Sequence, residues 1–546
     1  MIEQSEILRR RDMRDVFTFT IDPADAKDFD DALSFEIINQ GESSNKDEVS
    51  NLQTGEASNK DEVSNHQTGE ASNKDEVSNL QTGEASNKDE VSNLQTSEAS
   101  NKDEVSNLQT GEAQTDSPAV YQIGVHIADV SFYVRPGTKT DEDAYKRGTS
   151  VYLVDRVLPM LPEELCNDKC SLRPNEDKLC MSVIFTMDAD ARVRKYKICR
   201  TVIRSNARLN YDEAQQIIMA NQTSETQSRE NRIGGGTEAH RTQHEGNTQL
   251  SEAILVLNNI ASKLRAERIA NGALTIEQDE MRFRLDEHGH PTEIYFESPN
   301  EAHHLIEEFM LLANRTVAKA VGSGRPFVYR VHDLPDGEKL EAVSSFRKRF
   351  PNLQRAIDLL TIRAQAKAVY STYNIGHYGL AFTHYTHFTS PIRRYPDLMV
   401  HRLVEKYILT GKKESLTREE LEEKCEHCSA CEQDAAQAER DSIKLFQAMW
   451  MSDHIGEVLP GHISGVTDFG LFVQLDESRC EGLIHISNIG EQGEYWQYDE
   501  KNFRLVCENK NHTSPETPKS YTLGDPVTVK VVRADVNRAQ IDFEFA

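Results

Sequence analysis

Alternating apolar and polar residues, the pattern of half-buried strands, recur in the first third of the chain. They occupy residues 17–21, 33–37 and 121–127. Apolar residues at helical spacing begin at Ser251 and again cover residues 301–320, where Asn300 is a suitable N-cap. This mixture predicts an α/β fold of the mixed α+β kind for residues 15–450, after a short N-terminal tail, residues 1–14.

Residues 456–546 change to short apolar runs separated by glycines. The runs are contained in the segments GEVLPGHISGVTDFGLFVQL, EGLIHIS and DPVTVKVVRADVNRAQIDFEF. About five short strands in a segment of this size indicate a small barrel of the OB-fold kind. The chain is therefore predicted to be a mixed α/β domain followed by an all-β OB-fold barrel.

Two polar inserts interrupt the α/β region. Residues 44–113 are five tandem copies of the unit SNKDEVSNLQTGEA, with departures only at His66 and Ser97. Each copy has only Val and Leu as sizeable apolar residues, so burial cannot offset its ordering entropy, and residues 39–118 are predicted to be disordered. Strand-like segments flank them, which predicts an expanded hairpin tip. The second insert, residues 221–249, is predicted to be a flexible loop.

Charge and composition restrict the class of protein. The net charge is −28, and because each repeat copy carries −2, the five copies account for −10 of it. The remaining acidity disfavours a diffuse basic surface for nucleic acid, but a buried positive channel is compatible with it. Nine cysteines without framework spacing fit a reducing compartment, and no apolar segment has the length of a membrane span. A cytoplasmic protein without a membrane partner is expected.

Five aspartates lie close together in the segment FTIDPADAKDFDDALSF. Four of them, Asp22, Asp28, Asp30 and Asp31, would repel one another strongly, and a hard divalent cation such as magnesium would remove this repulsion. In a fully extended strand Asp31 would point away from its neighbours, so the site needs a bend or two ions. A solvated acidic loop is the alternative. An EF-hand is disfavoured because its turn glycine and closing glutamate are missing. Carboxylate-bound ions of this kind usually serve phosphoryl transfer.

The four-aspartate pattern resembles that of the ribonuclease II and ribonuclease R exoribonucleases. The segments GVHIADVS, from Gly124, and HFTSPIRRY, from His387, resemble ribonuclease R more closely. The resemblance covers nearly all of the chain outside the two inserts. It implies a magnesium-dependent 3′ to 5′ exoribonuclease that hydrolyses single-stranded RNA to nucleoside 5′-monophosphates, with one or two ions, for which manganese could substitute.

The resemblance also implies roles for individual residues. The four aspartates would bind metal, and Asp30 would be the most directly catalytic of them. Arg393, with Arg394 as second choice, would stabilise charge that develops at phosphorus. The residues implied to contact RNA are Tyr152, Glu307 and, on a barrel that resembles the repeated RNA-binding OB fold of the largest ribosomal small-subunit protein, Phe469, Phe472 and His485. Without the resemblance, Tyr152 and one of the two phenylalanines would be assigned to a core.

Other chemistry-bearing residues favour structural roles. His126 and Asp129 are expected to make structural hydrogen bonds. His303 and His304 each lie four residues before a glutamate, but a solvated helix face is the better interpretation of such pairs. The cysteine groups match neither a zinc nor an iron–sulfur spacing. Glu439 lies near a functional glutamate of the family.

Two rival functions come from other classes. The first is an RNA-binding regulator of the same fold that no longer cleaves, which the intact aspartates disfavour. The second is a small-molecule phosphohydrolase, indicated by a strand followed by DFDD and disfavoured by the RNA-type barrel. Cold-shock OB domains and a lysine-rich tail, usual in ribonuclease R, are not recognisable in the sequence, so a weak grip on RNA and poor unaided unwinding of duplexes are expected. The expected partner is single-stranded RNA, and the protein is expected to be a monomer.

Overall fold

The computed structural model describes residues 2–38, 55–56, 119–220, 245–275, 279–411, 417–490, 494–508 and 519–546. Most of both predicted inserts therefore lies outside the described residues. Two boundaries differ from the predictions. A two-residue strand, Gly55–Glu56, occurs within the first repeat copy and pairs with an exposed strand edge, which offers free backbone groups. The helix expected from Ser251 begins at Glu245, inside the predicted second loop.

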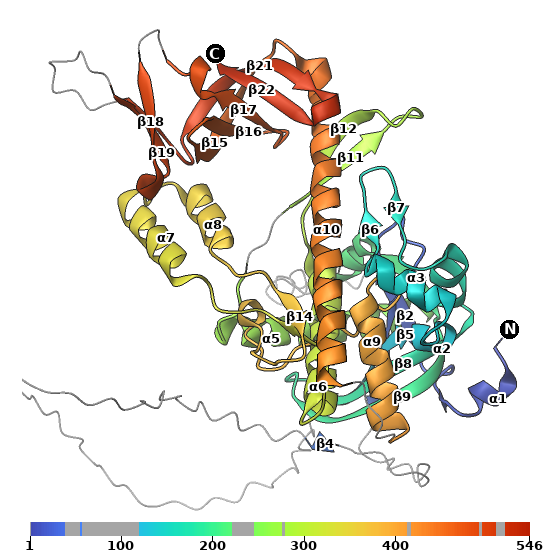
Figure 1. Ribbon diagram of the computed structural model, residues 1–546. Helices are drawn as coiled ribbons and strands as arrows, with labels where there is room; N and C mark the ends of the chain where they lie inside the picture. The colour runs from blue at the N-terminus through green and yellow to red at the C-terminus, as the bar shows by residue number, and fades with distance from the viewer. Residues whose placement is uncertain are drawn as a thin grey trace, which may run out of the picture. The chain divides into compact units, whose positions relative to one another are not determined.

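An eight-stranded sheet organises the α/β region (Figure 1). Its strands, in spatial order, are β1 (Arg11–Asp12), β9 (Val193–Arg204), β8 (Asp177–Asp188), β5 (Val120–Ala128), β3 (Asp31–Ile38), β2 (Thr18–Asp22) and β10 (Ala207–Asn210), and β4 (Gly55–Glu56) pairs with β9. All pairs are antiparallel except β1 with β9 and β2 with β10. Ile38 lies opposite Val120, so β3 and β5 form the hairpin predicted on either side of the repeats.

The strand β2 is more deeply buried than its alternating pattern predicts. All five of its residues are buried, including Thr18 and Thr20. Both faces of the sheet are therefore covered at this strand, while β3 and β10 pair with it along its two edges. The Thr18 hydroxyl is satisfied locally, since it donates to the carbonyl of Val16 at 2.9 Å.

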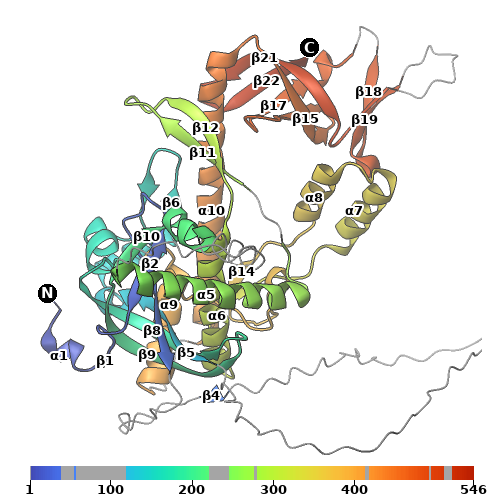
Figure 2. The same cartoon turned by 180° about the vertical axis from the view of Figure 1, so that it is seen from behind.

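The helices of the described chain lie mostly after the sheet in sequence (Figure 2). They are α1 (Gln4–Ile7), α2 (Val130–Tyr133), α3 (Lys139–Arg147), a helix over residues 211–220, α5 (Glu245–Ala270), α6 (Glu301–Gly322), α7 (Gly337–Arg349), α8 (Gln354–Arg363), α9 (Tyr395–Val404) and α10 (Arg418–Met451). As predicted, α6 starts after Asn300, whose side chain accepts the N–H of His303. α5 packs along α6, and α6 contacts β5 and α9, so one hydrophobic core joins the sheet to these helices. None of the described helices combines the length and the apolar composition that crossing a membrane requires.

Three two-stranded sheets and a barrel complete the fold. Two of these sheets are hairpins, formed by β6 (Val151–Tyr152) with β7 (Val157–Leu158) and by β11 (Glu280–Leu285) with β12 (Pro291–Glu297). The third pairs β13 (Tyr329–Val331) with β14 (Val369–Ser371), between which α7 and α8 lie in the sequence. The predicted barrel is closed by β15 (Val458–Thr467), β16 (Gly470–Leu475), β17 (Glu481–His485), β22 (Gln540–Phe545) and β21 (Pro526–Asp535). A small sheet of β18 (Tyr495–Asp499), β19 (Arg504–Glu508) and β20 (Ser520–Thr522) is inserted in it. Ala448 and Met451 at the end of α10 are part of the barrel core.

Candidate active site

β2 and β3 bring the two ends of the aspartate segment together. Asp22 ends β2 and Asp31 begins β3, and the two strands pair with Thr18 opposite Ser34. Residues 23–30 form the loop between them. The chain therefore makes the predicted bend, and Asp22, Asp30 and Asp31 lie at the same end of one hairpin.

The second half of this loop is anchored by neighbouring segments. The N–H of Phe29 donates to Oγ of Ser171 at 3.0 Å, and the carbonyl of Phe29 accepts the N–H of Leu172 at 2.9 Å. The carbonyl of Asp30 accepts the N–H of Ala128 at 2.8 Å. Phe29 is buried, so its ring fixes the loop between the aspartates on either side of it.

Burial raises the pKa of all four aspartates. Desolvation is the largest cause in each case. Asp31 and, more weakly, Asp28 raise the pKa of Asp22 further. The pKa of Asp30 is raised well above its usual range, although the charge of Arg393 and the N–H of Ile392 oppose this rise. The ionised state of this cluster is therefore costly unless a cation accompanies it.

The aspartates fit divalent ions that also take ligands from water or substrate. Oδ2 of Asp22 is buried and has no hydrogen-bond partner among the described residues, so it is available to an ion. Among the residues that the structure describes, no group of three or more His, Cys, Asp or Glu side chains is arranged to hold an ion by itself. Magnesium is commonly held by only one or two carboxylates, with waters and phosphate oxygens as its other ligands. Binding by all four aspartates remains a prediction.

The turn before α9 places a cation beside Asp30. The N–H of Ile392 donates to Oδ1 of Asp30 at 2.9 Å, and Nε of Arg393 lies 3.8 Å from Oδ2. Nη2 of Arg393 donates to Oγ of Ser390 at 3.0 Å, which orients the guanidinium. The Arg393 side chain is 43% exposed, so it can face a substrate as well as the carboxylate.

Arg394 turns away from the aspartates. Arg394 is the N-cap residue of α9, and its side chain binds within that helix and not to Asp30. Nη2 of Arg394 donates to Oδ1 of the fully buried Asp397 at 2.9 Å, and the same oxygen accepts the N–H of Ser390 at 2.8 Å. The geometry therefore favours Arg393 as the cation of the site and gives Arg394 a structural partner instead.

Tyr152 lies beside the same cluster. It is 41% exposed on β6, in contrast to the buried core position expected without the resemblance. Burial of its hydroxyl raises its pKa, with opposing effects of Arg393 on one side and Asp28 and Asp30 on the other. Its N–H donates to Oε1 of Glu439 on α10 at 3.1 Å, so α10 fixes this strand. The proposed stacking of this exposed ring on a base remains a prediction.

One residue of the site, Tyr211, was not identified from the sequence. Burial raises its pKa, and the charges of Asp31 and Asp22 raise it further, which places its hydroxyl near both carboxylates. Its ring stacks on that of His303, with centroids 3.8 Å apart and an interplanar angle of 11°. Its only sequence signal is its place directly after β10, which pairs with β2.

The two glutamates of the His303–Glu307 and His304–Glu308 pairs on α6 both accept hydrogen bonds from Arg268, and because Glu308 is buried the expected solvated helix face is wrong for it. Nδ1 of His303 lies 2.8 Å from Oδ1 of Asn300, and the ring stacks on Tyr211. Glu307 lies one turn further along α6 and accepts a hydrogen bond from Nη2 of Arg268 at 3.3 Å. Its side chain is 45% exposed, so the proposed contact with RNA remains a prediction.

His126 and Asp129 have the structural roles that were predicted. His126 is fully buried between Oγ of Ser182 at 2.8 Å and Oγ of Ser34 at 2.9 Å, and desolvation lowers its pKa to about 3. Asp129 is buried and forms ion pairs with Arg10 and Arg200. Arg10 thereby ties the N-terminal segment to the sheet.

The predicted RNA-contacting residues of the barrel lie on its surface. Phe469 is 45% exposed and Phe472 is half-buried, with ring centroids 5.9 Å apart. His485 is exposed and lies opposite Gly470. The expectation that one phenylalanine is a core residue is wrong, because Phe472 alternates with the buried Leu471 and Val473, and Phe469 lies before β16 begins.

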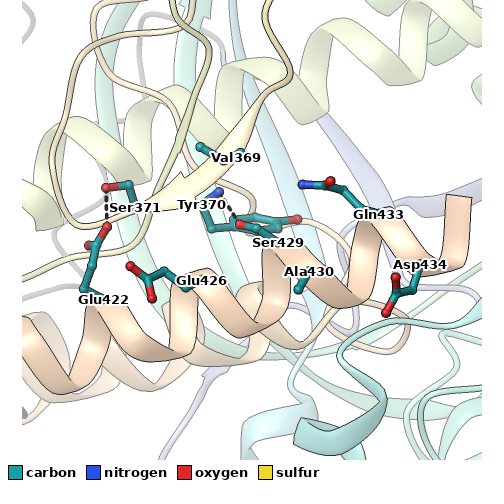
Figure 3. Close-up of a pocket in the computed structure, with 9 residues that line it drawn as sticks. All are labelled: Val369, Tyr370, Ser371, Glu422, Glu426, Ser429, Ala430, Gln433 and Asp434. Carbon is teal, nitrogen blue, oxygen red and sulfur yellow. Dashed lines mark hydrogen bonds between the residues drawn. The ribbon is translucent and has the colours of Figure 1, made fainter.

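A cavity of about 470 Å³ lies elsewhere, between β14 and α10 (Figure 3). Its lining includes Glu422, Glu426 and Asp434. The hydroxyl of Ser371 donates to Oε1 of Glu422 at 2.7 Å, so this carboxylate already has a hydrogen-bond partner within the protein. Carboxylates repel phosphate, so this cavity does not compete with the aspartate site as the place where a polynucleotide reacts.

Known proteins resemble the whole chain. The model of the RNB domain matches residues 10–410, and that of the S1 RNA binding domain matches residues 452–545. Ribonuclease R of Aquifex aeolicus is 34% identical over 570 aligned residues, which cover 100% of this chain and 66% of the relative. Ribonuclease R of Thermotoga maritima is 37% identical, over 78% of this chain and 60% of the relative. The chain thus spans less than two thirds of the length of these curated relatives.

Solved structures share the fold at lower identity. Mycoplasma genitalium RNase R in complex with ribose methylated single-stranded RNA has a TM-score of 0.75 and 22% identity, over 100% of this chain and 73% of that chain. Yeast Ssd1, described as a pseudonuclease, has a TM-score of 0.59 and 17% identity, over 93% of this chain and 54% of that chain. Because the RNB model matches well over half of the sequence and the S1 model matches its C-terminal barrel, the chain belongs to the RNB-domain family, with proteins named ribonuclease R among its relatives.

Proposed function

We propose that this protein is a magnesium-dependent 3′ to 5′ exoribonuclease that hydrolyses single-stranded RNA to nucleoside 5′-monophosphates. The observation that carries the proposal is the convergence of two distant motifs on one carboxylate, because Ile392 and Arg393 both approach Asp30. An acidic cluster for ions beside a fixed cation is the arrangement that phosphodiester hydrolysis requires.

Magnesium, held by Asp22, Asp28, Asp30 and Asp31 together with phosphate oxygens, would activate water and neutralise developing charge. The guanidinium of Arg393 would bind a phosphate oxygen and stabilise the charge that develops there. Tyr152 would stack on a base near the 3′ end and so hold the terminal phosphodiester at the aspartates. Stacking on an aromatic ring does not depend on the identity of the base. This suits an enzyme that degrades RNA from one end, because it must accept every base in turn.

The barrel is proposed to deliver the RNA. Phe469, Phe472 and His485 form an exposed aromatic surface in the segment that matches the S1 RNA binding domain. Contacts of this kind bind single strands without sequence preference. Single-stranded RNA is therefore the proposed partner of a monomeric protein. All nine cysteines lie among the described residues and none forms a disulfide there, which supports a reducing, cytoplasmic location.

A catalytically silent RNA-binding protein is the main rival, since a pseudonuclease shares this fold. The intact aspartates and the position of Arg393 favour the enzyme. A small-molecule phosphohydrolase is disfavoured because it would not need the barrel.

The test is incubation of the protein with a 5′-labelled single-stranded RNA, with magnesium or with EDTA. The expected result is magnesium-dependent accumulation of a very short labelled fragment and of nucleoside 5′-monophosphates. Binding without cleavage would support the silent rival, internal cuts would exclude an exonuclease, and release of inorganic phosphate from a nucleoside monophosphate would support the phosphohydrolase.

A further inference from the structure

The first half of the aspartate loop depends on one arginine from a neighbouring strand. Arg208 lies on β10, opposite Thr20 of β2, and its side chain reaches over the loop. Nη2 of Arg208 donates to the carbonyl of Ala24 at 2.9 Å and to that of Pro23 at 3.1 Å. A longer contact of 3.4 Å reaches the carbonyl of Ala26. One nitrogen thus contacts three carbonyls of the short segment 23–26.

The same guanidinium also packs on the second half of the loop. The Arg208 guanidinium carbon lies 4.8 Å from the centre of the Phe29 ring, a cation–π distance. Phe29 is buried and separates Asp28 from Asp30. Arg208 therefore connects the part of the loop that follows Asp22 with the part that carries the later aspartates.

Other anchors do not duplicate this connection. Ser171 accepts the N–H of Phe29 at 3.0 Å and donates to the carbonyl of Lys27 at 2.8 Å. These bonds hold only the second half of the loop. Among the described residues, Arg208 makes the only side-chain hydrogen bonds to the carbonyls of Pro23, Ala24 and Ala26. Within the part of the chain that the structure describes, Arg208 forms no ion pair with a carboxylate, so the N–H groups of its guanidinium donate to the loop.

We propose that Arg208 is a positioning residue of the metal site, which sets the separation of Asp22 from Asp28, Asp30 and Asp31 by clamping the loop that joins them. This inference rests on the proposed function, because it assigns the aspartates to metal binding. A planar guanidinium can donate to several carbonyls and stack on a ring at once, whereas an ammonium group supplies a single point charge without a stacking plane. The metal site therefore depends on the planar geometry of the Arg208 guanidinium and not only on its charge.

The test compares Arg208→Lys, which retains the charge, and Arg208→Met, which removes it. The matched control is Arg204→Lys, because Arg204 is an exposed arginine that pairs with Asp177 and touches no part of the loop. Manganese binding to each protein is measured by calorimetry without RNA. We expect both Arg208 variants to bind manganese about tenfold more weakly than the parent, as for other residues that orient metal ligands.

Three further measurements separate positioning from general damage. The melting temperature in EDTA and the affinity for RNA in EDTA should match the parent, because Arg208 is exposed and contacts only the loop. Hydrogen exchange of residues 23–26 should be faster in both Arg208 variants. The magnesium concentration for half-maximal hydrolysis should rise by a similar factor, and kcat at saturating magnesium should fall less.

The outcomes are distinguishable. Parental manganese affinity in Arg208→Lys, with loss only in Arg208→Met, would show that charge suffices and would overturn the proposal. Parental affinity in both variants would also overturn it and would leave the proposed function intact. A parent protein that neither binds manganese nor hydrolyses RNA would instead contradict the proposed function itself.

Discussion

Asp30 and Ile392 are separated by 362 positions in the chain, yet the N–H of Ile392 donates to Oδ1 of Asp30 at 2.9 Å. This hydrogen bond joins the loop after β2 to the turn before α9. It also fixes the orientation of the carboxylate, because Nε of Arg393 approaches the other oxygen at 3.8 Å. One carboxylate thus has a backbone donor on one oxygen and a cation near the other, which makes Asp30 the central residue of the site.

Replacement of Asp30 by asparagine should separate binding from hydrolysis. The amide oxygen can still accept the N–H of Ile392, so the fold should persist, but the loss of one negative charge weakens metal binding. We expect Asp30→Asn to bind single-stranded RNA at least as well as the parent and to hydrolyse it slower by orders of magnitude. Asp25→Asn is the control, since Asp25 is an exposed aspartate of the same loop outside the pattern. Cleavage at the parental rate by folded Asp30→Asn would remove this carboxylate from the mechanism.

Replacement of Arg393 and replacement of Arg394 by alanine should have different effects. Arg393→Ala should be folded but slow, because it loses a cation that stabilises developing charge. Arg394→Ala should unfold more easily by roughly 3–5 kcal/mol, since it leaves the buried Asp397 without its partner. Urea denaturation and single-turnover hydrolysis of each variant check this contrast. A stable, inactive Arg394→Ala protein would contradict the assignment of Arg394 to structure.

Stability without divalent ions should fall as pH rises. Burial raises the pKa of Asp22, Asp30 and Asp31 in the folded protein above the ordinary aspartate value. Between that ordinary value of about 4 and neutral pH, the folded state therefore holds more protons than the unfolded state, so the free energy of unfolding decreases with pH. Magnesium replaces these protons, and the stabilisation that it provides should grow with pH.

Melting temperatures measured in EDTA and in magnesium from about pH 5 to about pH 8 check the sign of this effect. The variant Asp22→Asn/Asp31→Asn is the control, because it cannot take up these protons. Its stability in EDTA should depend less on pH than that of the parent. Equal slopes for the two proteins would show that other groups control the pH dependence.

The barrel aromatics should contribute to RNA affinity and not to stability. Phe469 is 45% exposed, whereas Leu471 on the same strand segment is fully buried. Phe469→Ala should weaken binding of single-stranded RNA by about 1–3 kcal/mol without changing the melting temperature. Leu471→Ala, the control, should lower stability by about 2–5 kcal/mol. Substitution is preferable to removal of the barrel, because removal would expose Ala448 and Met451.

The sequence predicted the parts of this fold that depend on local pattern. The hairpin that flanks the repeats and the start of α6 after Asn300 both follow from periodicity and capping, and the structure confirms them. The burial of Thr18 and Thr20 could not be predicted, because it depends on what covers the second face of β2. Alternation indicates which residues share a face of a strand but not what covers the other face.

The candidate site likewise contains residues that the sequence revealed and residues that only the structure revealed. The aspartates and Arg393 occur in dense motifs, so their chemistry was visible in the sequence. That Arg393 approaches Asp30 while Arg394 binds Asp397 depends on the turn before α9, which only the structure shows. Arg208 lies in the short strand β10 and Tyr211 begins the helix that follows it, and neither belongs to a motif of its own. Their proximity to the aspartates arises from the parallel pairing of β10 with β2.

Deletion of residues 44–113 should leave hydrolysis and the melting temperature nearly unchanged. Ile38 and Val120 lie opposite each other at the ends of β3 and β5, so a short turn can join them after the deletion. The contact that would be lost among the described residues is the pairing of Gly55–Glu56 with Tyr196 and Lys195 of β9. Two residues of strand at a sheet edge contribute little to stability.

A second deletion, of residues 58–113, keeps β4 and tests this contact separately. Both proteins should melt within about a degree or two of the parent, because neither deletion removes a residue of the hydrophobic core that the structure describes. If only the larger deletion lowers the melting temperature, pairing with β9 stabilises the sheet edge. If both deletions weaken RNA binding or hydrolysis equally, the repeats have a role in RNA handling that the strand pairing does not explain.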